Sequence, residues 1–442
     1  MPQAVSLADS VAEEGPHGQA SAQPPADMGP RGLTLERVLF LALRNHETPL
    51  TAKQRAIAAE ARVDRALALF MPTVSLLGTY TRRAFQTERV VGGERVIIQN
   101  HNALAASGTA RLSLFNARSI PLYNQAKYER DAARWSEKDA RRVFLGSVAK
   151  AFLLGLGTEQ VMLAARQRVG FAKENEEQAK QRAELGLVSS NDVTRAELES
   201  SAARTQLSRS IVDFKQSRLE LGNLITRPVK SPLLEPVRLL EQASGVHGNP
   251  GLMIKRALSV RADLRAARSQ REALKASADE PSLRVLPSLG VVGQVRATNE
   301  SGISGRNVDG YVGAELSWEL WDGGSRSAEE EERDALAVIG DLDVRALARQ
   351  LNVEVHSALV ALRQGQETEE QARMTVASAR RNGQEIMELY RQGLATALLV
   401  ADANVQLFEA EVAHAQAKYG VAIALIDLRQ AVGLDPLGRK LL

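Results

Sequence analysis

The chain of 442 residues contains no cysteine, which excludes disulfide bonds, thiolate metal ligands, a cysteine nucleophile and a lipidated N-terminal cysteine. Aromatic residues make up only 4% of the chain, and its six histidines are scattered, with no pair at metal-ligand spacing. A catalytic triad and a phosphate-binding glycine loop are also missing. The sequence therefore predicts neither an enzyme nor a protein that binds a metal or another cofactor.

An excess of one charge is also absent. The chain has 56 basic and 53 acidic residues, and no basic run contains interleaved aromatic side chains, so we expect no nucleic-acid partner. No uncharged apolar run approaches the roughly 18 to 20 residues that a transmembrane helix needs. If the protein spans a membrane, it is therefore expected to do so with strands.

The N-terminal segment at 1–32 has little apolar content. It holds five prolines among small polar residues and is predicted to be disordered. The small residues ASAQ at 20–23 would suit a signal peptidase, but no apolar stretch precedes them. A signal peptide is therefore not visible in this sequence.

What the chain does contain is an internal repeat. Pro72 aligns with Pro287 at an offset of 215, Leu114 aligns with Leu320 at 206, and the turns ELGLVSS and RQGLATA lie 207 residues apart. Each copy reads helix, strand, long loop, strand, long helix, turn, long helix. Because the offset falls by nine between the two strands, the first copy is expected to carry about nine more residues in the loop between them.

The repeat predicts a mainly α fold with a small membrane β-barrel contribution. The expected parts are a disordered segment at 1–32, a first repeat at 33–228, a linker at 229–248 and a second repeat at 249–436. The strand hairpins are expected at about 72–115 and 287–321, and the long helices at about 117–226 and 325–432. At 1.5 Å per residue, a helix over 117–185 would be roughly 100 Å long.

Both repeats interrupt their long helices in the same way. Glycine suits the left-handed position after a helix, and a hydroxyl three residues later can accept from the first turn of the next helix. Gly186 and Ser189 are expected to play these roles in the first copy, and Gly393 and Thr396 in the second. Each turn should therefore join two antiparallel helices.

The strand segments alternate between apolar and polar residues. After Pro72, the side chains of Val74, Leu76 and Tyr80 share one face and those of Ser75 and Thr79 the other. The pattern fits an outer-membrane barrel, apolar towards lipid and polar towards a lumen, but also a half-buried sheet of a soluble protein. Four strands cannot close a membrane barrel, whereas two copies would supply eight strands and three copies twelve.

Five stretches together resemble the TolC-like outer-membrane efflux protein family. They are LTLERVLFLALRNH, LSLFNAR, LSWELWDGGSR, ELGLVSSNDVTRAEL and RQGLATALLVADANVQL, and the resemblance covers 33–436. It implies a homotrimer with one twelve-stranded barrel in outer-membrane lipid and a helical tunnel that crosses the periplasm. It also implies a periplasmic adaptor (membrane fusion) protein and an inner-membrane transporter as partners. The helix turns would then lie at the periplasmic mouth of an export duct.

The resemblance also directs attention to acidic residues beyond each turn. Members of the family carry Asp six and often nine residues after the glycine, and those of the second repeat narrow the entrance. Here the first copy has Asp192 at plus six and Arg195 at plus nine, and the second has Leu399 and Asp402. Asp402, Leu399 and Asp192 are thus candidate gating residues. The alternative is that both aspartates are ordinary first-turn acids that the helix dipole favours.

Other conspicuous residues lie at the strand ends. Asp322 is expected to cap the helix that follows it, and Trp318 and Trp321 suit either a membrane interface or a core. Gly92-Gly93 and the SGISG run at 301–305 are interpreted as parts of loops.

Two classes of function remain open at this stage. The first is a passive outer-membrane duct of a tripartite efflux or type I secretion system, which would carry drugs, metals or proteins. The second is a soluble coiled-coil scaffold or interaction protein, which the absence of a visible signal peptide favours.

Overall fold

A computed structural model describes residues 32–245, 248–300 and 306–439. Apart from Gly32, the segment predicted to be disordered lies outside the described residues, as does the SGISG run.

The described chain is mostly helical with a small sheet and repeats one order of elements, which confirms the predicted fold class. The first repeat contains α1 (Leu35–Asn45), α2 (Glu47–Leu67), η1 (Ala68–Phe70), β1 (Thr73–Arg82), β2 (Thr87–Val91), β3 (Glu94–Gln99), β4 (Asn102–Phe115), α3 (Ser119–Glu184) and α4 (Ser190–Leu224). The connection and the second repeat contain α5 (Val237–Gly245), α6 (Pro250–Val260), α7 (Ala262–Leu283), β5 (Ser288–Thr298), β6 (Val308–Ser317), α8 (Ser325–Arg391) and α9 (Ala397–Ala431).

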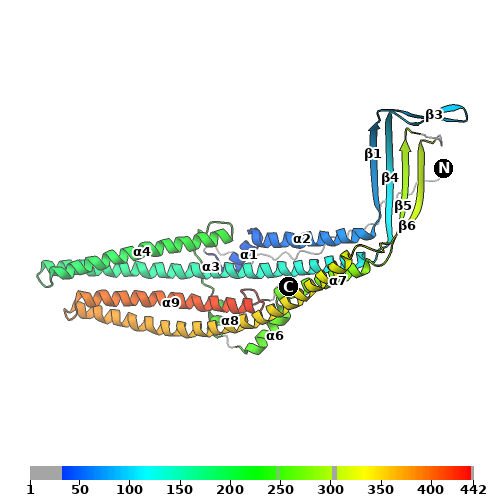
Figure 1. The fold of residues 1–442 in the computed structure, drawn as a ribbon. Helices are drawn as coiled ribbons and strands as arrows, with labels where there is room; N and C mark the ends of the chain where they lie inside the picture. The colour runs from blue at the N-terminus through cyan, green and yellow to red at the C-terminus, as the bar shows by residue number, and fades with distance from the viewer. Residues whose placement is uncertain (1–31, 246–247, 301–305, 440–442) are drawn as a thin grey trace, which may run out of the picture.

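Helices α3 and α8 run the length of the molecule and set its elongated shape (Figure 1). They contain 66 and 67 residues, about 100 Å each at 1.5 Å per residue. Near the sheet, α2 packs on α3, and α7 contacts both α3 and α8. Towards the far end, α4 packs on α3, and α9 packs on α8 and α3. The sheet and the two helix turns therefore lie at opposite ends.

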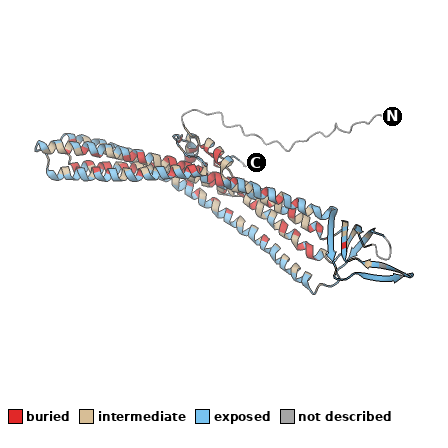
Figure 2. Cartoon of the chain, turned by 90° about the horizontal axis from the view of Figure 1, so that it is seen from above, coloured by how far each residue is buried: buried red, intermediate tan, exposed pale blue. Residues whose placement is uncertain are grey.

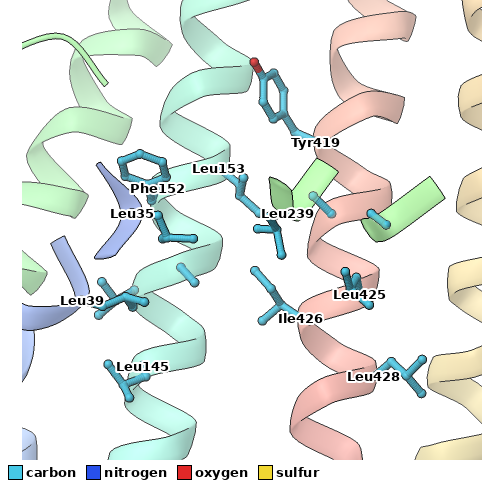
Figure 3. Packing of buried hydrophobic residues seen from close by; sticks show 14 of the residues in the cluster. Leu35, Leu39, Leu145, Phe152, Leu153, Leu239, Tyr419, Leu425, Ile426 and Leu428 are labelled. Carbon is cyan, nitrogen blue, oxygen red and sulfur yellow. The ribbon is translucent and has the colours of Figure 1, made fainter. Parts of the chain in front are cut away.

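The main hydrophobic core lies near the middle of the molecule, between the part where α2 and α7 pack on the long helices and the part where α4 and α9 do so (Figure 2). Leucine, isoleucine and phenylalanine side chains from α1, α3, α5 and α9 meet there, with Phe152, Leu153 and Ile426 fully buried (Figure 3). Burial of such side chains stabilises the fold by roughly 1.5–3 kcal/mol each. The core thus joins the two repeats.

Among the described helices, only α3 is long and apolar enough to cross a membrane by length and composition. Its residues between Phe144 and Leu156 include many members of the main core. This packing explains the apolar composition of α3 without a membrane.

The strands form one antiparallel sheet in the order β1-β4-β5-β6, so the hairpins of the two repeats lie side by side through β4 and β5. Residues directly opposite in the ladders share a face. The register confirms that Val74, Leu76 and Tyr80 share one side of the sheet, which we call the apolar face. The residues on this face are Val74, Leu76, Gly78, Tyr80, Leu104, Ala106, Gly108, Ala110, Leu112, Phe115, Leu289, Val291, Gly293, Val295, Gly310, Val312, Ala314 and Leu316. Strands β1 and β6 leave the sheet with two open edges.

The connection between β1 and β4 differs from the expected loop. It contains the hairpin β2–β3, which extends from the outer end of the sheet (Figure 1). Gly92 and Gly93 form its two-residue turn with φ of +64° and +90°, a conformation that glycine adopts without a steric cost. The additional residues of the first repeat thus build a small sheet of their own.

A cluster of charged side chains lies where the helices meet the sheet. Glu280 in α7 is only 1% exposed and forms ion pairs with Arg118, Arg284 and Arg333 at 3.3, 2.6 and 2.9 Å. The Arg284 guanidinium donates hydrogen bonds to the carboxylates of Glu280 and Glu329, and these bonds raise its pKa. Since Arg118 directly precedes α3 and the other residues come from the end of α7 and the start of α8, the cluster joins these three helices at the base of the sheet.

Candidate functional site at the helix turns

The first helix turn joins α3 to α4 at the end of the molecule farthest from the sheet (Figure 1). Gly186 has a φ of +72°, and the Leu187 amide donates to the Arg182 carbonyl at 2.9 Å, which satisfies a free carbonyl of the last turn. Ser189 caps α4: its hydroxyl accepts from the Asp192 amide, while the Asp192 carboxylate accepts from the Ser189 amide. This capping box fixes the path of the chain into α4.

The second turn joins α8 to α9 at the same end and repeats this geometry. Gly393 has a φ of +78°, and the Leu394 amide donates to the Leu389 carbonyl at 2.8 Å. The Thr396 hydroxyl accepts from the Leu399 amide at 3.4 Å. The two repeats thus form two helical hairpins whose tips lie together.

Replacing Gly186 by alanine is expected to destabilise the first hairpin by about 1–2 kcal/mol, because an L-residue pays to adopt the left-handed conformation. A Cβ at Gly186 would contact no atom within 4 Å, so the cost would be conformational rather than steric. The control is Gly170→Ala, in the interior of α3 and equally uncrowded, which should stabilise the same helix by about 0.5–1 kcal/mol. Denaturant unfolding measures both, and equal effects would contradict the conformational argument.

Arg182 of the first hairpin binds the end of the second. Its guanidinium donates to the carbonyls of Tyr390 and Arg391 at 2.8 and 3.1 Å, and it lies 4.4 Å from the centre of the Tyr390 ring. Those carbonyls belong to the last turn of α8, where a cation is favoured by the helix dipole. Arg391 also forms an ion pair with Glu174 of α3 at 3.8 Å. The hairpins are therefore joined close to their tips.

Tyr390 lies in a small apolar cluster beside this contact. It is 1% exposed and packs with Ala397 and Val400 of α9. Burial raises the pKa of the Tyr390 phenol, because the interior disfavours the phenolate. Among the described residues, its hydroxyl has no hydrogen-bond partner. The Tyr390 ring packs against the Arg182 guanidinium.

The three candidate gating residues have different environments. Asp192 uses its carboxylate in the capping box, as the alternative of an ordinary first-turn acid requires. Asp402 is exposed on α9, and one of its oxygens accepts from the Gln406 side chain at 2.8 Å. Leu399 is 47% exposed, one turn nearer the tip. Of the three residues, Asp402 and Leu399 are exposed to solvent, whereas Asp192 is half-buried in the first turn.

Sequence reasoning missed two features of this end. One is the Arg182 contact, which no local motif signals because its partners lie about two hundred residues away. The other is a group of exposed leucines at both tips: Leu185, Leu187, Leu394 and Leu398. The Gly-Leu pairs of the two turns were the available signal, since a leucine that follows a C-terminal glycine at an exposed tip has no core to enter. These leucines form an apolar surface at the tips.

Among the described residues, no group of three or more His, Cys, Asp or Glu side chains is placed to hold a metal ion.

These features define a subunit with two helical hairpins, a four-stranded sheet at one end and paired tips at the other. The sequence matches the family model described as "Outer membrane efflux protein" over 38–226 and 253–434. The chain therefore belongs to the outer membrane efflux protein family, whose members are outer-membrane channels of tripartite pumps and not enzymes. This assignment favours the duct over the soluble scaffold.

Solved structures share the fold. The chain is 19% identical to a membrane protein from Pseudomonas aeruginosa, with a TM-score of 0.78 and coverage of 90% of this chain and 92% of that one. It is 16% identical to the outer membrane protein VceC from Vibrio cholerae, with a TM-score of 0.75 and coverage of 91% and 96%. It is 17% identical to the Neisseria gonorrhoeae MtrE outer membrane channel, with a TM-score of 0.75 and coverage of 92% and 90%. A comparison with curated proteins returned no relative.

Proposed function

We propose that three copies of this chain form one continuous duct from the periplasm to the cell exterior. The observation that carries the proposal is the sheet, whose apolar face is exposed and whose edge strands β1 and β6 are unpaired within the chain. Lipid does not tolerate open edges, and a four-stranded sheet is too small to close alone. Pairing β6 of one copy with β1 of the next gives a twelve-stranded barrel.

In this arrangement the helices extend the barrel into the periplasm, and the β2–β3 hairpin faces the exterior. The tips then form the periplasmic entrance, about 100 Å below the sheet by the length of α3 and α8. The exposed leucines at the tips suit contact with a periplasmic adaptor protein, and an inner-membrane transporter would supply substrate and energy. The duct itself would be passive.

At the entrance we assign Asp402 and Leu399 to the constriction. A three-fold axis would bring three copies of each close together, as a ring of negative charge and an apolar ring one turn nearer the tip. Asp192 lies at the same end, but its bonds to Ser189 give it the task of holding the first turn. Rings of carboxylates bind cations in channel entrances.

The test is the conductance of the purified trimer in planar bilayers, with a trivalent cation added on the periplasmic side. Block by the cation is expected to weaken at least about tenfold in Asp402→Ala, because three carboxylates leave the entrance together. The matched control is Asp213→Ala, an exposed aspartate of α4 far from the tip, which should leave the block unchanged. If Asp402→Ala is blocked as readily as the unaltered channel, Asp402 is only a surface acid.

A further inference from the structure

The sheet has a second side, opposite the apolar face, which we call the polar face. Within the four strands of the sheet, its charged residues are Arg111, Arg296, Asp309 and Glu315. Arg296 lies directly opposite Asp309 on the neighbouring strand, where opposite charges attract each other. Arg111 and Glu315 have no residue of opposite charge across from them on a neighbouring strand of the chain. The first two charges thus balance each other, whereas the other two do not.

Arg111 and Glu315 lie near the end of the sheet from which the helices leave. Arg111 of β4 lies between Thr73 of β1 and Val292 of β5, is exposed, and has no acceptor for its guanidinium among the described residues. Glu315 of β6 lies opposite Gly290, is also exposed, and its carboxylate has no donor among the described residues. The proposed barrel turns this face towards the lumen, so both charges would project into the path of the cargo.

Closure of the proposed barrel determines how the two charges are arranged. With β6 of one copy paired to β1 of the next, the strand order around the barrel is β1, β4, β5 and β6, repeated in each copy. Arg111 lies on the second strand of each set and Glu315 on the fourth, so every second strand carries a charge and the sign alternates. Neighbouring strands are about 4.8 Å apart, which separates consecutive charged strands by about 10 Å.

The two sets of charges also lie at similar depth in the barrel. Three-fold symmetry places the three copies of Arg111 at one height and the three copies of Glu315 at another. Across β5, Arg111 is level with Gly313, and Glu315 follows two residues later, about 7 Å along the strand. Both the spacing around the barrel and this offset are no larger than the Debye length of about 10 Å in 0.1 M salt. The two sets therefore act together on a passing ion.

We propose that Arg111 and Glu315 of three copies form one charge-balanced ring inside the barrel, which makes the exit indifferent to the sign of the cargo's charge. An ion on the barrel axis faces three guanidinium and three carboxylate groups at similar distances, so their opposite effects on its energy nearly cancel. Discrimination by charge then remains at the periplasmic entrance. The inference rests on the proposed trimer and adds the residues that decide which charges can leave through the barrel.

Reversal potentials of planar bilayers in a potassium chloride gradient test this balance. All channels carry Asp402→Ala, so that the entrance contributes no selectivity of its own. Arg111→Gln leaves three unbalanced carboxylates and should raise the permeability ratio of potassium to chloride at least about threefold, and Glu315→Gln should lower it at least about threefold. The variant with both changes should return to the ratio of the balanced ring. Both shifts should shrink at about 1 M salt, where the Debye length is about 3 Å.

Two further variants change the side chains but preserve the balance. Arg111→Lys keeps the positive charge, and Arg111→Glu combined with Glu315→Arg exchanges the two signs, so both should retain the ratio of the balanced ring. Conducting single variants without a shift would overturn the ring and leave the duct intact. Shifts that persist when both charges are removed would also overturn it, because each charge would then act alone. Unaltered protein that inserts without conducting would contradict the duct itself.

Discussion

Replacing Glu280 by alanine is expected to lower the free energy of unfolding by about 3–5 kcal/mol, the cost of removing one partner from a buried ion pair. Glu280 is almost fully buried and is the shared acceptor for Arg118, Arg284 and Arg333. Without it, three guanidinium groups face one another with only Glu329 to balance them. Mutual repulsion should separate the ends of α7 and α8 at the base of the sheet.

Denaturant unfolding of the trimer in detergent, at a fixed protein concentration, measures this effect. The matched control is Glu331→Ala, an exposed acid of α8 with no ion pair among the described residues, which should change the free energy of unfolding by less than about 0.5 kcal/mol. Since the cluster joins the helices at the base of the sheet, Glu280→Ala should also reduce the amount of trimer in the outer membrane. Equal stability of the two variants would show that the arginines find other acceptors.

Replacing Arg182 by alanine is expected to separate the two hairpins near their tips. The change removes two charge-assisted hydrogen bonds to α8 carbonyls, worth about 1.5–3 kcal/mol each, and the contact with the Tyr390 ring, worth about 0.5–2 kcal/mol. Because other contacts along the helices persist, the loss should be local. Amide exchange should accelerate at least about tenfold around Tyr390, and the conductance of the trimer should rise.

Two controls separate this contact from general damage at the tip. Tyr390→Phe removes only a hydroxyl that has no partner among the described residues, so exchange and conductance should be unchanged. Arg195→Ala removes an exposed arginine of α4 at the same end and should also have no effect. If all three variants behave alike, Arg182 does not join the hairpins.

Much of the fold could be predicted because its signals are local and occur twice. A glycine at a helix end and a hydroxyl three residues later act within one turn of the chain, and the apolar alternation that begins at Val74 needs only the period of a strand. The β2–β3 hairpin could also have been predicted. Gly92-Gly93 lies between residues with strand propensity, a pattern typical of a hairpin, but we interpreted it as a loop. There the error was one of interpretation, not of missing information.

The site was less predictable because its contacts join residues that are distant in sequence. Nothing near Arg182 indicates that it binds the last carbonyls of α8, and nothing near Glu280 indicates that three arginines surround it. The family's spacing of six residues between the glycine and an aspartate selected Asp192. That position is also the third residue of α4, where a capping box uses the same carboxylate. A spacing rule cannot distinguish these two uses; the hydrogen bonds of the turn can.

The pairing of β4 with β5 has a consequence for the order of folding. The ladder places Ala105 opposite Thr298, 193 residues later, so about two thirds of the 442 residues must be synthesised before the central pair of strands can form. Helical hairpins form from near neighbours and fold fast, whereas such distant pairings are slow. We therefore expect the helices to fold first and the sheet last. The edge strands β1 and β6 would stay unpaired until another copy of the chain binds. Completion of the sheet thus becomes a step that depends on subunit concentration.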